Sequence, residues 1–144
     1  MGHPAYHPGA VTLPRRLLLF VALPLAVGVA SYGLWRENVP WLGVHRPPWP
    51  HAPAILRDHF ADAAWAFAVG GLVASLWREG PRAMRLGWYA AGLAVCVAVE
   101  LLQYAHVFPG AFDALDLAVQ VMAFVVGVMA AGGVERWTSA HAVA

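Results

Sequence analysis

Three stretches of the sequence place carboxylate and amide side chains at helical spacing within long apolar runs. Spacings of three, four and seven residues put side chains on one face of an α-helix. Such side chains can serve as a general acid or base, bind a cation, or hold the polar head group of a lipid. The predicted site residues are Asp62, Glu100, Gln103, Asp113, Asp116 and Gln120.

Glu100 is the central residue of this predicted site. It lies in the last third of its apolar run, where the helix dipole disfavours an anion and the membrane penalises a charge. We therefore expect a neutral carboxyl group, a hydrated one, or one paired with an arginine of the preceding polar loop. The candidate arginines are Arg36, Arg46 and Arg57. A purely structural ion pair or hydrogen bond at Glu100 is the competing interpretation.

Helix capping is the competing interpretation for three of the aspartates. Asp58, Asp113 and Asp116 lie at expected helix starts, where a carboxylate accepts hydrogen bonds from free backbone N–H groups. Asp62 lies a full turn further into its helix, so capping explains it less well. The positions of the aspartates alone therefore do not distinguish a binding or catalytic site from helix capping.

The histidines and the single cysteine predict no metal site and no cofactor. His59 and His106 flank the carboxylates and are the candidate ligands if a divalent cation binds there. Cys96 is interpreted as a small packing residue. The sequence contains no G-x-S-x-G motif, P-loop or H-E-x-x-H motif, and no catalytic nucleophile is identifiable. Whether the chain is an enzyme stays open, although a binding role is favoured.

Four apolar runs must position these side chains. The chain has 144 residues, of which 60% are hydrophobic and 12% charged. Each run has roughly the 20 residues that a membrane-spanning helix needs. The sequence therefore predicts an all-α, integral membrane four-helix bundle. Its expected parts are a flexible tail over 1–14, one domain over 15–137 with spans 17–35, 60–77, 86–105 and 114–134, a Pro- and Trp-rich outer loop over 36–59, and a C-terminal tail over 138–144.

The distribution of arginine predicts the orientation of the bundle. All nine basic residues are arginine, and six fall on one side if the spans alternate: Arg15, Arg16, Arg78, Arg82, Arg85 and Arg136. By the positive-inside rule both termini are cytoplasmic. The carboxylates then lie in the outer leaflet of the inner (cytoplasmic) membrane. A net charge of +1 gives no basic surface for nucleic acid.

Details of the spans support this arrangement and leave one alternative open. Interfacial aromatic residues are expected at Trp35, Trp77, Trp88, Tyr104 and Trp137. Pro24 should kink the first span. That span also resembles a signal peptide in part, and its cleavage would leave three spans.

The residues Glu100–Gln103, Phe108–Asp113 and Asp116–Gln120 resemble the signature of VanZ-like membrane proteins. The E-x-x-Q pattern, the P-G and F-D loop elements and the following Asp all match, while Gln120 stands where Asn is usual. The sequence also departs from the pattern at Ala111, Asp62 and Ala123. The resemblance implies a small multi-pass protein of the bacterial cell envelope, with a role of the glycopeptide-resistance type.

Two functions of different kinds follow from the sequence. In the first, the polar layer binds or processes a lipid head group or a lipid-linked envelope precursor. In the second, the chain is an accessory subunit of a larger membrane assembly, and the polar layer only locks its helices together. An enzyme acting on lipids, with Glu100 as general acid or base, ranks below both. A proton-coupled transporter is disfavoured because the opposite halves of the helices are apolar.

Overall fold

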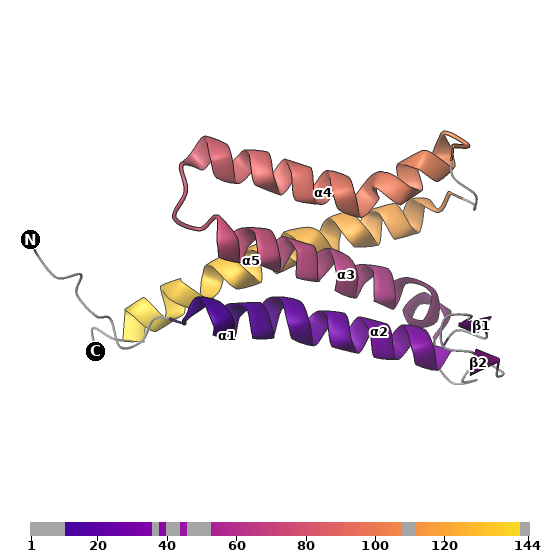
Figure 1. The fold of residues 1–144 in the computed structure, drawn as a ribbon, viewed down its shortest axis with the longest axis horizontal. Helices are drawn as coiled ribbons and strands as arrows, with labels where there is room; N and C mark the ends of the chain where they lie inside the picture. The colour runs from indigo at the N-terminus through magenta and orange to yellow at the C-terminus, as the bar shows by residue number, and fades with distance from the viewer. Residues whose placement is uncertain (1–10, 36–37, 40–43, 46–52, 108–111, 142–144) are drawn as a thin grey trace, which may run out of the picture.

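The computed structural model describes residues 11–35, 38–39, 44–45, 53–107 and 112–141, and side chains over 11–35, 53–107 and 112–133. These residues form four long helical segments and one short pair of strands (Figure 1). The elements are α1 (Leu13–Leu17), η1 (Leu18–Ala22), α2 (Leu23–Trp35), β1 (Asn38–Val39), β2 (Val44–His45), α3 (Ala54–Leu76), α4 (Arg82–Tyr104) and α5 (Ala114–His141).

Helix α3 lies at the centre of the arrangement. It contacts α2 on one side and both α4 and α5 on the others. Figure 1 shows α1 and α2 in line along one side of α3 and α4 along the opposite side, with α5 crossing behind. The closest packing joins α3 to α5, because a side chain at Gly70 or Gly127 would collide with the backbone carbonyl of Phe124 or Phe67. Two backbones approach this closely only where small residues face each other.

The first span is a single helical path with a wider, π-helical turn at η1. Pro24 lies two residues after this turn and has no N–H to donate to the carbonyl four residues earlier, which belongs to Phe20. That carbonyl oxygen lies against Gly71 of α3, where an added Cβ would be 2.7 Å from it. The π-helical turn therefore lies just before Pro24, in the region where the sequence predicted a kink.

The helices are long and apolar enough to cross a membrane, as in a multi-pass membrane protein. Four spans meet this description among the described residues: Leu13–Trp35, Ala54–Leu76, Arg82–Tyr104 and Ala114–Gly133. The all-helical fold with four spans, predicted from the sequence, is confirmed. Helix α3 begins directly after Pro53 rather than at residue 60, and α5 continues to His141 through the expected tail. The short strands β1 and β2 pair antiparallel within the expected loop.

Polar side chains gather at one end of the bundle, which we call the polar end. It comprises the start of α3, the end of α4 and the start of α5, at the right of Figure 1. Aromatic pairs lie at both ends. Trp35 contacts Phe60 edge to face at the polar end, and Trp77 stacks on Trp88 at 4.1 Å near the opposite end. The side chain of Trp137 lies outside the described part.

The end opposite the polar end holds a buried arginine. Arg16 of α1 donates a hydrogen bond from Nη2 to the carbonyl oxygen of Ala131 in α5. Its neighbour Arg15 is exposed. This bond connects the first span to the last across 115 positions of the chain.

Candidate functional site

The polar end brings together side chains from three helices. His59 lies near the start of α3, Glu100 near the end of α4, and Asp113 and Asp116 at the start of α5. At about 1.5 Å of rise per residue, these groups lie within roughly 8 Å of their helix ends. We call these four residues the polar cluster.

At the polar end, a side-chain hydrogen bond joins α3 to α5 through His59 and Asp116. His59 Nδ1 hydrogen-bonds to Asp116 Oδ1, and the two side chains are 12% and 20% exposed. The sequence interpretation placed His59 at the margin of the site. The structure places it within the site, on the face of α3 that meets α5.

The contact between α4 and α5 passes through Glu100. This residue is 7% exposed, and its Oε2 accepts a hydrogen bond of 3.3 Å from the backbone N–H of Asp113. Asp113 in turn caps α5, because its Oδ1 accepts a 2.8 Å hydrogen bond from the N–H of Leu115. The capping role considered for Asp113 is confirmed. Asp113 therefore both caps α5 and belongs to the polar cluster.

The arginines considered as partners for Glu100 divide into two groups. Arg57 Nε donates a 2.9 Å hydrogen bond to the adjacent Asp58. Arg36 and Arg46 lie outside the described residues. The partner described for Glu100 is the backbone N–H of Asp113. This hydrogen bond adds no charged group to the site.

Gln120 lies one turn beyond Asp116 on the same face of α5. It is 5% exposed, and its Oε1 is buried with no hydrogen-bond partner among the described residues. A buried amide oxygen without a partner costs about 1–3 kcal/mol. Together with the close approach of α5 to α3, this places an unused acceptor inside the bundle directly below the polar cluster.

The remaining predicted residues lie around this cluster. Asp62 is part-buried on α3, three positions after His59 and on the same face. Gln103 is part-buried near the end of α4. His106 is exposed and lies just past that end, and it is not among the residues whose ligand atoms come together.

His106 has a backbone role instead. It adopts a left-handed conformation with φ of 56°. Its N–H bonds to the carbonyl of Gln103 and that of Val107 to Leu102, which is the Schellman arrangement that ends a helix. The spacing of polar residues could not reveal this role, because the signal lies in the backbone.

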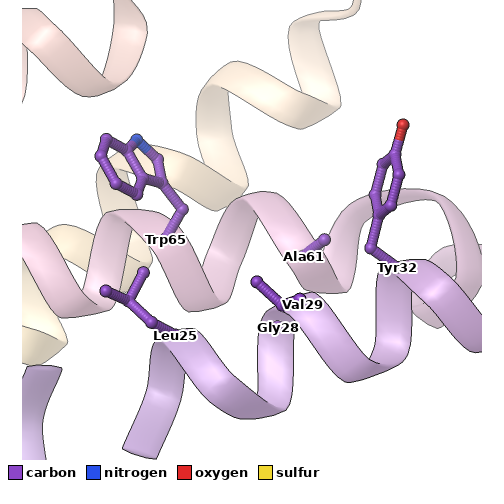
Figure 2. Close-up of a pocket in the computed structure, with 6 residues that line it drawn as sticks. All are labelled: Leu25, Gly28, Val29, Tyr32, Ala61 and Trp65. Carbon is purple, nitrogen blue, oxygen red and sulfur yellow. The ribbon is translucent and has the colours of Figure 1, made fainter. Parts of the chain in front are cut away.

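The described residues also form an apolar hollow of about 170 Å³ between α2 and α3. Figure 2 shows it lined by Leu25, Gly28, Val29 and Tyr32 of α2 and by Ala61 and Trp65 of α3. Ala61 is two positions from His59, which places it on nearly the opposite side of α3. The hollow is therefore separate from the polar cluster.

The geometry of three cluster members suits a metal ion. One ligand atom each from His59, Asp113 and Asp116 lies within 4.8 Å of the others. Small residues are buried on α4 at Gly92 and Cys96 and on α5 at Gly127 and Ala131. No family model, curated protein or solved structure matches this chain in the comparisons made. The argument for function therefore rests on the site itself.

Proposed function

We propose that this chain is a multi-pass protein of the cytoplasmic membrane that binds the head group of a lipid, or of a lipid-linked envelope precursor, at its polar end. The observation that carries the proposal is the convergence of Glu100, Asp116 and His59 from three helices onto one end of a bundle of apolar helices. Polar groups inside a membrane are costly, and proteins retain them where they bind or move something.

The arginine distribution supports the placement of this site in the outer leaflet. Arg16, Arg78 and Arg85 lie at the end of the bundle opposite the polar cluster. The positive-inside rule puts that end in the cytoplasm and the polar end toward the cell envelope. The similarity of Glu100–Gln120 to the VanZ-like signature supports the same location, and we propose membership of that family on this basis.

Partial burial of the cluster suits a ligand that enters from the membrane surface. Asp113 is exposed, Asp116 is 20% exposed, and Glu100 and Gln120 are buried behind them. A head group can therefore reach the carboxylates while its acyl chains stay against the apolar helix faces. The unpartnered Oε1 of Gln120 offers an acceptor to a ligand N–H or O–H group.

The test is retention of a ligand by a variant that keeps the fold. Glu100→Gln removes the ionisable carboxyl group but keeps an oxygen that can accept a hydrogen bond from the N–H of Asp113. The matched control is Glu79→Gln, at an exposed position near the opposite end. Wild type, variant and control are purified from native membranes in mild detergent, and everything that remains bound is identified by mass spectrometry.

We expect wild type and Glu79→Gln to retain one kind of lipid or precursor that Glu100→Gln loses. Equal retention by all three proteins would refute the proposal. Recovery of a stoichiometric partner protein with no small ligand would favour the accessory-subunit alternative instead. In that case the polar cluster would only hold the helices together.

A further inference from the structure

The polar cluster brings three carboxyl groups together with a single imidazole. Asp113 and Asp116 each bring a carboxylate to within 4.8 Å of the same imidazole nitrogen. Glu100 is buried and bonded to the backbone of Asp113. Ionised carboxylates in a poorly hydrated site repel one another strongly, and a single imidazole can offset at most one of their charges. The nearby guanidinium of Arg57 is bonded to Asp58.

We propose that His59, Asp113 and Asp116 bind a divalent transition-metal ion such as Zn²⁺. One imidazole nitrogen and two carboxylate oxygens are a ligand set typical of such ions. Two positive charges would offset the two aspartates directly. The ligands come from helices far apart in sequence, which is how metal sites in helical bundles are built.

The three ligand atoms would have to move only a little to bind an ion. Ligand atoms about 2.0–2.2 Å from a tetrahedral ion lie roughly 3.3–3.6 Å from one another. The three ligand atoms already lie within 4.8 Å of one another. His59 and Asp116 are in direct hydrogen-bond contact. The ion takes the place of the proton between them, and both side chains separate slightly.

A second, independent observation is the buried acceptor beside the site. Gln120 lies one turn from Asp116 on the same face of α5, and its Oε1 has no partner among the residues that the structure describes. An amide oxygen is a suitable ligand, or a second partner for a metal-bound water. A buried, unused acceptor next to a His–Asp–Asp group is the arrangement expected of a protein whose site is completed by an ion.

Three protein ligands leave at least one coordination position for another molecule. Asp113 is exposed, so that position can be reached from outside the bundle. An ion there would attract the phosphate of a head group, which the carboxylates alone would repel. This last step rests on the proposed function, whereas metal binding does not.

The experiment measures metal binding without lipid. The full-length chain is purified in detergent with its affinity tag removed, stripped with a chelator, and titrated with Zn²⁺ by calorimetry. Co²⁺ absorption reports the coordination of the bound ion. The variants are His59→Gln and Asp116→Asn. The matched control is Asp58→Asn, which removes a carboxylate next to His59 that is outside the ligand group.

We expect one tight Zn²⁺ per chain, with affinity reduced roughly tenfold or more in both variants and unchanged in the control. Asp113→Asn is the further variant if another fails to fold, because Asn caps a helix as well as Asp does. Absence of stoichiometric binding, or equal binding by variants and control, overturns the proposal. If zinc binds while Glu100→Gln still retains its lipid, the metal site stands and the head-group proposal falls.

Discussion

His59 and Asp116 are 57 positions apart in the chain and bond side chain to side chain at one end of the bundle. Their contact connects the central helix α3 to α5. A hydrogen bond between membrane helices contributes about 0.6–1.7 kcal/mol by double-mutant cycles. The pair therefore has a structural role in the metal-free protein, whichever ligand the site takes.

The first prediction concerns that role. His59→Ala and Asp116→Ala should each lower the free energy of unfolding, and the double variant should lose less than the sum. The expected coupling is about 1 kcal/mol. It is measured by unfolding in mixed micelles with a chelator present, so that metal does not contribute. Strictly additive losses would mean that the two side chains do not interact in the membrane protein.

The second prediction concerns the close approach of α3 and α5. Gly127→Ala should destabilise the protein by about 1–3 kcal/mol, because the new Cβ would collide with the carbonyl of Phe67. Gly132→Ala is the matched control on the same helix, where a Cβ meets nothing within 4 Å. Thermal unfolding in detergent compares the two. Similar midpoints would show that the helices are further apart than described here.

The third prediction concerns the end of α4. His106→Gly should raise the free energy of unfolding by about 1 kcal/mol, because glycine adopts the left-handed conformation at φ of 56° without a Cβ clash. His106→Ala keeps the Cβ and serves as the control, with little expected gain. The same thermal assay applies. A loss of stability in His106→Gly would indicate that the imidazole makes a contact worth more than the backbone strain.

The fourth prediction separates stability from function at Gln120. Gln120→Met should leave stability unchanged or raise it by about 1 kcal/mol, because it removes a buried acceptor that has no partner among the described residues. Ligand retention should fall in the same variant. Unfolding and mass spectrometry are run on one preparation. A marked loss of stability together with unchanged retention would make Gln120 a structural residue.

The sequence could predict the four spans because length and hydropathy are local properties. It could also bring Glu100, Asp113 and Asp116 to the same end, because each lies near an end of its own helix. It could not predict the bond between His59 and Asp116. That bond depends on how α3 is rotated against α5, and the rotation is fixed by the close backbone contacts at Gly70 and Gly127.

Other differences also have local physical causes. Pro53 precedes α3 without needing to donate a hydrogen bond, so the helix begins directly after it and includes residues expected in the loop. A π-helical turn over Leu18–Ala22 lies just before Pro24, where the sequence predicted a kink. Neither outcome is visible from the rule that proline opposes helices, because the effect of proline depends on its position in the helix.

The hydrogen bond from Arg16 to Ala131 has a consequence for how the protein is made. The acceptor lies 115 positions after the donor, in the last span. While the chain is being synthesised, the first span enters the membrane long before its partner exists. Until then the guanidinium must find its hydrogen bonds in water and lipid phosphates at the membrane surface. Completion of this end of the bundle therefore waits for the final helix, because a chain that stops before α5 lacks the carbonyl of Ala131 that accepts this hydrogen bond.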